Sequence, residues 1–434
     1  MTKIKRIQLG LLHVAVAMTL VPINSTLNRV MIKELGMPAT LVAVLASLPF
    51  LLAPIQMVIG SHSDRHPFMG RRRTPYIAVG LLLCAFGVAA APQAAFLLDG
   101  SPGIGLAAAV LCFGAWGMGY NLSSVSYLSL ATELSGEDGR GKTIAVMWFM
   151  MILGIILTAI GLGHLVDPYS PAALSRAFAI TAALALVLGA IGLYELEPRS
   201  QSSGEVAENY TLAQIGAVIA QNPVARTYFV YLLLLLAAIL GQDVLLEPFA
   251  AEAFGMSVVQ TTRITSVWGT MVLAAIAIAG ALEGRTSRRS VAHTGNIGAL
   301  IGLLVILSSG LARSSGLFYG GVMLLGVGTG LSTVANLALM FELTIPGQVG
   351  LYMGAWGFSN ALSRLTGSVM GGAVRDVVVS MTGDALRGYL AVIAVEAAFL
   401  LIATWMLGRM DLQAFKHQAV DLDLMEVAAV ASDG

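Results

Sequence analysis

The segment Gly60-Ser-His-Ser-Asp64-Arg65-His-Pro-Phe-Met-Gly70-Arg71-Arg72-Arg73-Thr-Pro75 is a densely charged loop between two long apolar runs. Its four arginines oppose transfer through a bilayer. By the positive-inside rule we therefore expect the loop to stay in the cytoplasm and to fix the direction of the helices on both sides. A solvated loop that only sets topology is the simplest interpretation of this segment.

The composition of the whole chain agrees with a membrane protein. Of its 434 residues, 57% are hydrophobic and 11% are charged, whereas about 25% of the residues in soluble domains are charged. The 24 basic and 24 acidic residues cancel, so nothing favours a nucleic-acid partner. The composition predicts an integral membrane protein whose first partner is the lipid bilayer.

Apolar runs long enough to cross a bilayer recur along the chain. A transmembrane helix needs about 20 mostly apolar residues, and about twelve runs qualify. They are 7–27, 39–60, 76–98, 104–132, 143–166, 174–196, 224–248, 258–282, 290–312, 316–342, 350–372 and 387–408. The pattern predicts an all-α protein with an N-terminal six-helix half (1–196), a cytoplasmic linker (197–222), a C-terminal six-helix half (223–410) and a cytoplasmic tail (411–434).

The basic residues are distributed unevenly over the predicted loops, which indicates that both termini are cytoplasmic. The predicted outer loops carry six: Arg29, Lys33, Arg176, Arg313, Arg375 and Arg387. The predicted inner segments carry many more: Lys3, Lys5, Arg6, Arg65, Arg71, Arg72, Arg73, Arg140, Lys142, Arg199, Arg226, Arg285, Arg288, Arg289, Arg409 and Lys416.

The two halves resemble each other in sequence. Glu34-Leu-Gly36-Met37 corresponds to Ala253-Phe-Gly255-Met256 at a shift of 256 − 37 = 219 residues. The same shift carries Asp64 onto Glu283, beside three arginines, so the charged loop has a weaker copy in the second half. Parallel repeats of six helices, related by an axis along the membrane normal, place a central cavity between the halves. We therefore predict two pseudo-symmetric bundles.

Polar residues within the spans are candidates for a functional cavity, since they are costly in a membrane. Asn24 and Asn28 share a helix face, and the shift of 219 relates them to Asp243 and Glu247. Arg29, Arg263 and Arg364 could serve as cationic partners of these acids. Alternatively, Arg29 and Glu247 lie at outer helix ends and only face interfacial water.

Three further polar residues are weaker candidates. Asn121 and Asn336 could line the cavity or hydrogen-bond between helices. His13 could ligate the magnesium of a chlorophyll through its neutral imidazole, although one histidine near a helix end is more commonly a packing residue. The remaining histidines show no metal-ligand spacing, so we predict no metal site.

Motifs of common enzyme classes are missing from the sequence. It contains no phosphate-binding Gly-x-x-x-x-Gly-Lys-Ser/Thr loop, no Gly-x-Ser-x-Gly elbow and no Asp-rich prenyl-diphosphate motif. We therefore do not expect an enzyme.

Two resemblances add to this interpretation. The order Gly-x-x-x-Asp-Arg, then Gly-Arg-Arg, resembles the signature loop between the second and third helices of major facilitator transporters. That resemblance implies a conformational role for the loop and its copy, in residues Gly60, Asp64, Arg65, Gly70, Arg71, Arg72 and Glu283. Two stretches resemble the PucC/LhaA family, the bacteriochlorophyll delivery family of photosynthetic bacteria. They are Thr26-Leu-Asn28-Arg29-Val-Met-Ile-Lys-Glu34-Leu-Gly36-Met-Pro38-Ala-Thr-Leu-Val42-Ala, and Ser63-Asp64-Arg65 leading to Gly70-Arg71-Arg72-Arg73-Thr-Pro75-Tyr76-Ile.

The second resemblance implies a multi-pass protein of the bacterial inner membrane that handles bacteriochlorophyll or a precursor as cargo, with no covalently bound cofactor. Light-harvesting polypeptides or pigment-synthesis enzymes would be its partners. Two alternatives remain open: an ion-coupled transporter of a small solute, driven through Asp243 and Glu247, and a scaffold that assembles pigment proteins without transport.

Overall fold

A computed structural model describes residues 2–410, except 57, 58, 60, 61, 64, 65, 67, 69, 199–222, 282–284 and 343–348. Ten of its helical stretches are long and apolar enough to cross a membrane. A second span, interrupted between Ala39 and Leu51, and the 34-residue helix α14 supply two more crossings. The predicted all-α membrane fold of about twelve helices is confirmed.

The N-terminal half contains eight helical elements among the described residues. In chain order they are α1 (Lys3–Ala17), η1 (Pro22–Leu27), η2 (Val30–Glu34), α2 (Ala39–Ala46), α3 (Leu48–Leu51), α5 (Thr74–Gly100), α6 (Pro102–Leu165) and α7 (Pro171–Leu193). Two predicted spans are joined in α6, which changes direction at Gly136 because this residue has a non-helical backbone (φ 63°, ψ 177°).

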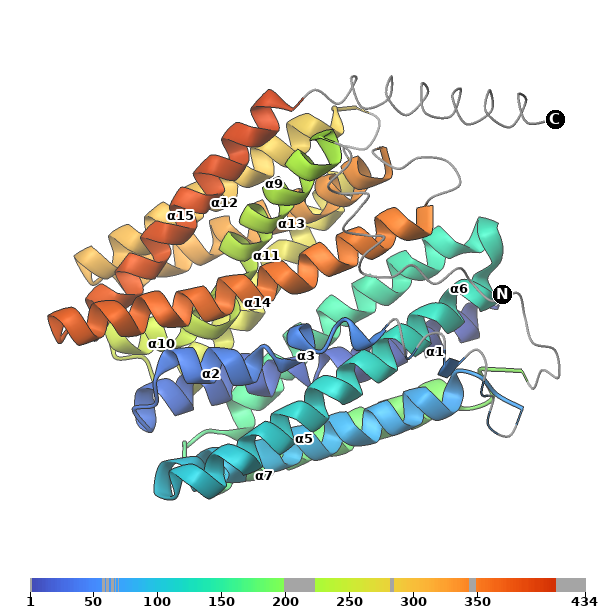
Figure 1. Cartoon of the computed structure of the whole chain (residues 1–434), viewed down its shortest axis with the longest axis horizontal. Coiled ribbons are helices and arrows are strands. Elements are labelled where there is room, and N and C mark those ends of the chain that lie inside the picture. Colours follow the sequence, from blue (N-terminus) through green and yellow to red (C-terminus); the bar gives the residue numbers. More distant parts are fainter. Residues whose placement is uncertain are drawn as a thin grey trace.

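The C-terminal half repeats this plan. Its elements are α9 (Pro223–Leu240), α10 (Gln242–Phe254), α11 (Val258–Ala281), α12 (Arg288–Ala312), α13 (Ser315–Glu342), α14 (Val349–Thr382) and α15 (Ala385–Arg409). Figure 1 shows the two halves as neighbouring bundles, the first in blue to blue-green and the second in yellow-green (α9) to red. The predicted linker from residue 199 onward and the predicted tail lie outside the described residues.

Because the spans alternate in direction, the bundle has two ends. We call the end that holds the start of α1 and the last turn of α15 the terminal face, and the opposite end the distal face. At the terminal face, Arg289 at the start of α12 donates to the carbonyls of Leu407 and Gly408 at the end of α15. At the distal face, Lys33 forms an ion pair with Glu252 of the other half.

Three spans differ from the continuous helices that the sequence predicts. The first changes from α1 to the π-helical turns η1 and η2, with Pro22 at the start of η1. The second breaks at Ser47, two residues before Pro49. Proline has no N–H and cannot continue a helical ladder. The seventh is interrupted at Gly241, between α9 and α10.

Close packing explains the glycine at the third interruption. A Cβ on Gly241 would lie 2.4 Å from the carbonyl oxygen of Ala237 and 3.1 Å from the carbonyl carbon of Gly367 on α14. The approach of α14 is closer still at Gly367, where an added Cβ would lie 2.5 Å from the carbonyl oxygen of Ala237, so the two glycines let α14 pack closely against the seventh span. The interruption therefore holds α14 against the start of α10.

Candidate functional site

The three helix interruptions meet at a pocket between the halves. Its walls come from η1, from the break between α2 and α3, from the α9–α10 junction and from α14. Irregular backbone at membrane depth is tolerated where it is buried in protein or lines a cavity. The pocket is lined by Asn24, Ala46, Ser47, Phe50, Leu240, Asp243, Val244, Arg364 and Ser368.

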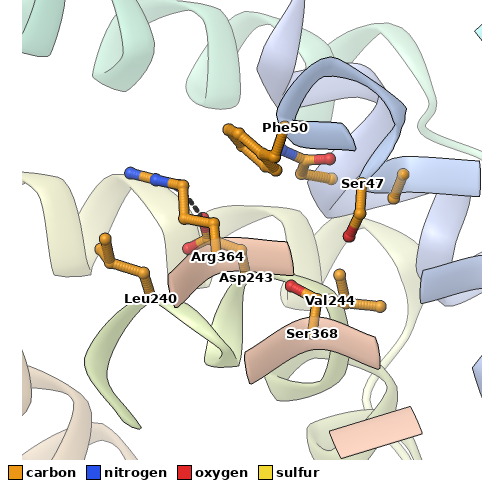
Figure 2. Close-up of a pocket in the computed structure, with 9 residues that line it drawn as sticks. Ser47, Phe50, Leu240, Asp243, Val244, Arg364 and Ser368 are labelled. Carbon is orange, nitrogen blue, oxygen red and sulfur yellow. Dashed lines mark hydrogen bonds and ion pairs between the residues drawn. The ribbon is translucent and has the colours of Figure 1, made fainter. Parts of the chain in front are cut away.

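An ion pair forms one wall of this pocket. Arg364 Nη1 lies 2.7 Å from Asp243 Oδ2, and both side chains are 30% exposed. Figure 2 shows Arg364 and Asp243 on the same side of the pocket, with Phe50 and Ser47 of the other half facing them. The Arg364 guanidinium also lies over the ring of Phe50, 5.4 Å from its centroid. Arg364 thus contacts both halves.

Two polar atoms beside the ion pair have no hydrogen-bond partner in the structure. They are Oδ1 of Asn24 and Oγ of the buried Ser47. Buried polar atoms are normally hydrogen-bonded, so these atoms are available to a ligand. The pocket offers one cation, one carboxylate, an amide oxygen and hydroxyl groups, and this set suits the polar end of a cargo that carries carbonyl or hydroxyl groups.

Hydrogen bonds join the halves in a layer on the distal side of the pocket. Glu247 of α10 accepts from the hydroxyl of Ser25 in η1 and, at 3.0 Å, from Thr265 of α11. The Thr26 and Thr262 hydroxyls lie 3.0 Å apart. Arg29 bonds to Glu34 and donates to the carbonyl of Met256 at 3.1 Å. We call this layer, together with the Lys33–Glu252 pair, the distal seal.

Asp376 of α14 extends the distal seal to α2. Its carboxylate accepts from the backbone N–H groups of Ala39 (3.0 Å) and Thr40 (2.8 Å) and from the Thr40 hydroxyl (2.7 Å). A carboxylate at the start of a helix satisfies N–H groups that have no partner within the helix. Here the capping carboxylate comes from the opposite half, so it holds the two halves together.

The structure separates the predicted cavity residues into two levels. Asn24, Asp243 and Arg364 lie together in the pocket. Arg29 and Glu247 lie in the distal seal, and Asn28 is fully buried, with its amide donating to the carbonyl of Asn24 at 3.1 Å. Arg29 and Glu247 are each 4% exposed. The alternative that these two only face interfacial water is therefore wrong, because the opposite half covers them.

Asn121 and Asn336 lie away from the pocket lining. The Asn121 amide donates to the carbonyls of Pro49 and Gly117, both at 2.8 Å, and its oxygen accepts from Gln56, so it supports the broken second span. In the C-terminal half, the oxygen of Asn336 accepts from the Tyr231 hydroxyl at 2.8 Å. Both asparagines form hydrogen bonds between helices, which was the other role open to them.

His13 is also remote from the pocket lining. It is 7% exposed, its ring centroid lies 5.2 Å from that of Tyr127 and 5.7 Å from that of Trp148, and its Nδ1 has no hydrogen-bond partner. A role as a magnesium ligand stays a prediction. Groups of three or more His, Cys, Asp or Glu side chains that could hold a metal ion are missing from the part of the chain that the structure describes.

The charged loop is described only in part. Gly60, Asp64, Arg65 and the corresponding Glu283 lie outside the described residues. Gly70 has φ +73° in a tight turn closed by backbone hydrogen bonds between Phe68 and Arg71. Arg72 lies 3.7 Å from Glu133, an ion pair to the end of the fourth span. The conformational role of the loop stays a prediction.

Glu197 is a residue whose role sequence reasoning missed. Its carboxylate accepts from the backbone N–H groups of Arg72 (2.7 Å), Arg73 (3.1 Å) and Thr74 (2.7 Å) and so caps α5. Glu197 is the first residue of the predicted linker, but these bonds tie it to the N-terminal half. Asp376 and Ser25 were missed for the same reason, since their partners are hundreds of residues away in the sequence.

Comparisons with known proteins identify similar sequences over nearly the whole chain. The family model described as "PUCC protein" matches residues 26–415. "Protein PucC" of Rhodobacter capsulatus is 32% identical over 414 residues, which cover 92% of this chain and 90% of that protein. "Bacteriochlorophyll synthase 44.5 kDa chain" of a strain of the same species is 29% identical over 407 residues, covering 92% of this chain and 93% of that one.

Solved structures share the fold at much lower sequence identity. The nucleoside transporter NupG, in a single-residue mutant form, matches with a TM-score of 0.74 at 14% identity, covering 94% of this chain and 99% of that one. A D-xylose-proton symporter matches with a TM-score of 0.69 at 13% identity, covering 93% and 97%. These likenesses establish the major facilitator fold, in which two six-helix halves enclose a central site.

Proposed function

Because the chain belongs to the PucC family, we propose that it is a membrane carrier or assembly factor that handles (bacterio)chlorophyll and supports the assembly of light-harvesting complexes. The family match over residues 26–415 carries this proposal. A relative that matches over 93% of its own length is named "Bacteriochlorophyll synthase 44.5 kDa chain". The transporter-like fold, with a polar pocket where three interrupted helices meet, supports a carrier or assembly role over catalysis.

The chemistry of the pocket suits one end of such a cargo. A tetrapyrrole pigment is a large apolar ring with a few carbonyl groups. Arg364 and Ser47 can donate hydrogen bonds to those carbonyls, while the ring would lie against apolar side chains such as Phe50 and Leu240. His13, which lies away from this pocket, is our candidate for a ligand of the pigment's magnesium at a second binding position in the protein.

The same proposal covers location and partners. The protein would reside in the inner membrane of a photosynthetic bacterium with both termini in the cytoplasm, where pigment is made and light-harvesting polypeptides are inserted. Pigment-synthesis enzymes or light-harvesting polypeptides would be its partners. Although one relative is named as a chain of a synthase, we propose that this chain carries or presents pigment and leaves its synthesis to other proteins.

The test is purification of the full-length protein in mild detergent from cells grown photosynthetically. We expect pigment absorbance, light-harvesting polypeptides or pigment-synthesis enzymes to co-purify. Arg364→Ala should reduce the bound pigment, and His13→Leu should shift its absorption band if His13 ligates the magnesium. Recovery of folded wild-type protein with neither pigment nor such partners would overturn the proposal.

A second candidate function is ion-coupled transport of a small solute. The half-exposed ion pair of Asp243 and Arg364 in the pocket favours it, since this pair could exchange partners with a charged or polar solute. Uptake or efflux in reconstituted vesicles that depends on pH and is lost in Asp243→Asn would support this function. A deletion strain that lacks only light-harvesting complexes would instead support the first.

A further inference from the structure

Glu247 lies at the centre of the contact between the halves and has an unusual set of hydrogen bonds. Its side chain, on α10, is 4% exposed. The hydroxyls of Ser25 and Thr265 both donate to its Oε1 atom. Its Oε2 atom is buried and has no hydrogen-bond partner in the structure. Two donors therefore serve one oxygen of the carboxyl group, and the other oxygen has none.

This one-sided arrangement suits a neutral carboxylic acid. In the acid, one oxygen is a carbonyl that can accept both hydroxyl hydrogens, and the other carries the proton. That O–H has no acceptor among the described residues, but a buried hydroxyl without a partner costs far less free energy than a buried charge without one. An ionised carboxylate would share its charge between both oxygens, leaving the charge on Oε2 buried without a donor or a cation. Such a buried, uncompensated charge is strongly unfavourable.

The charged groups around Glu247 do not neutralise it. Arg29 pairs with Glu34, Lys33 with Glu252, and Asp243 with Arg364. Among the described residues, no cation lies within ion-pair distance of Glu247. Several elements pack against α10, and their charged or titratable groups with described side chains are known. They are Arg29, Lys33 and Glu34 on the η1–η2 segment, Arg226, Tyr228 and Tyr231 on α9, Asp243 and Glu252 on α10 itself, Arg263 on α11, Arg364, Arg375 and Asp376 on α14, and Arg387, Tyr389, Glu396 and Arg409 on α15.

We infer that Glu247 is a proton-binding site that controls the distal seal. It holds a proton while the distal face is closed, and it gives that proton to water when the halves separate there. This inference concerns regulation of access to the pocket and rests on the proposed carrier cycle, but it does not depend on the identity of the cargo. It also divides the roles of the two acids: Asp243 faces the pocket, and Glu247 responds to protons.

The inference predicts that acid favours closure of the distal face. A proton that binds one conformation more tightly than another shifts the equilibrium toward the first. Because a single proton is involved, the ratio of closed to open molecules should change by at most about tenfold per pH unit. The closed fraction should therefore rise as the pH falls and then reach a plateau.

The test measures the distance between the halves at the distal face in the full-length protein. Spin labels are placed at Ser101→Cys, between α5 and α6 of the N-terminal half, and at Ser315→Cys, at the start of α13 in the C-terminal half; both positions are exposed at the distal face. The buried Cys84 and Cys112 are first replaced by alanine. Pulsed electron paramagnetic resonance is then recorded on the protein in lipid nanodiscs without pigment. It gives the fractions of molecules with short and with long distances between the two spin labels, at pH values from 5 to 9.

We expect the short-distance fraction of the wild type to increase at low pH. Glu247→Gln, which resembles the neutral acid, should stay closed at every pH. Glu247→Asp should keep a pH response with a shifted midpoint, which provides a second test if the glutamine variant does not fold. A wild type without a pH response, or a Glu247→Gln protein with an unchanged response, would overturn the inference.

Glu396→Gln is the matched control. Glu396, on α15, is fully buried and both of its carboxyl oxygens lack partners, yet it lies within the C-terminal half, next to Gly241. We expect this variant to keep the wild-type pH response. If Glu396→Gln abolishes the response and Glu247→Gln does not, Glu396 is the proton site and the inference is wrong. Absence of pigment from purified protein would contradict the proposed function and leave this measurement unaffected.

Discussion

Arg364 of α14 forms an ion pair with Asp243 of α10, with 2.7 Å between Nη1 and Oδ2, and the same guanidinium lies over the ring of Phe50 from the other half. One side chain thereby connects the polar wall of the pocket to both bundles. Movement of one half against the other must change the surroundings of Arg364.

Replacing Arg364 with alanine should lower cargo binding at least tenfold, because the pocket loses its cation and Asp243 keeps an unpaired charge. Both side chains are 30% exposed, so the loss of stability should be small, about 1 kcal/mol. Titration of cargo and thermal unfolding measure the two effects. Arg387→Ala, which removes an exposed ion pair with Asp384, is the control and should bind normally. If Arg364→Ala bound cargo normally, the ion pair of Arg364 and Asp243 would not be part of the binding site.

Replacing Asp376 with alanine should loosen the distal seal. The change removes acceptors for two backbone N–H groups and one hydroxyl of the opposite half. Loss of a helix cap costs about 1 kcal/mol, so the ratio of closed to open molecules should fall about fivefold. Reactivity of a cysteine at the neighbouring Leu41, which is partly buried and leaves the Thr40 contacts intact, measures the opening.

Asp384→Ala provides the comparison, because Asp384 caps α15 within its own half by accepting from the N–H groups of Leu386 and Arg387. It should lose similar stability without opening the seal. Equal cysteine reactivity in the two variants would show that the Asp376 cap does not hold the halves together.

Replacing Gly372 with alanine should prevent full closure at the distal face. The added Cβ would lie 2.8 Å from the carbonyl oxygen of Ala39 in the other half, which is too close for a carbon next to a backbone oxygen. Gly357→Ala, on the same helix, is the control, because nothing lies within 4 Å of its added Cβ. Spin-label distances across the distal face should increase only for Gly372→Ala. An unchanged distance would mean that α2 can shift to accept the methyl group.

Replacing Glu197 with glutamine should destabilise the N-terminal half. The carboxylate caps α5 through three backbone N–H groups and the Thr74 hydroxyl, and glutamine keeps the shape but loses one acceptor and the charge. We expect a loss of about 1–2 kcal/mol, measured as a lower unfolding temperature. Glu195→Gln, at an exposed position two residues away, should unfold like the wild type. If both variants unfolded at the same temperature, the Glu197 carboxylate would not stabilise the N-terminal half as a cap of α5.

Local features of the sequence were enough to predict the helical architecture. Apolar runs of membrane length and clusters of arginine require no knowledge of distant residues, and the family resemblance read from Thr26 to Ala43 is confirmed by the match over residues 26–415. The length of the apolar runs did not predict where a span is interrupted. Pro49 and Gly241 did not end an apolar run, so the second and seventh spans were predicted as continuous helices.

The candidate site was only partly predictable. Spacing grouped Asn24 with Asn28 and Asp243 with Glu247, but it could not say which members face a pocket. The structure places Asn24 with Asp243 and places Glu247 beside Ser25, a residue that no pattern marked. It also assigns Asn121 and Asn336 to interhelical contacts. The difference arises because Asp243 and Glu247 share one face of α10 about one turn apart, so the depth at which the other half contacts that face decides which acid lines the pocket.

The sequence by itself therefore determined the class of the protein, its two-fold repeat and its family, since hydrophobic length, charge bias and residue motifs are properties of contiguous segments. Only the tertiary structure decided which polar residues meet across the halves. The distal seal joins residues 25–40 to residues 247–376, and the pairing of groups so far apart depends on how two complete bundles pack. That packing separates the pocket acid Asp243 from the interface acid Glu247.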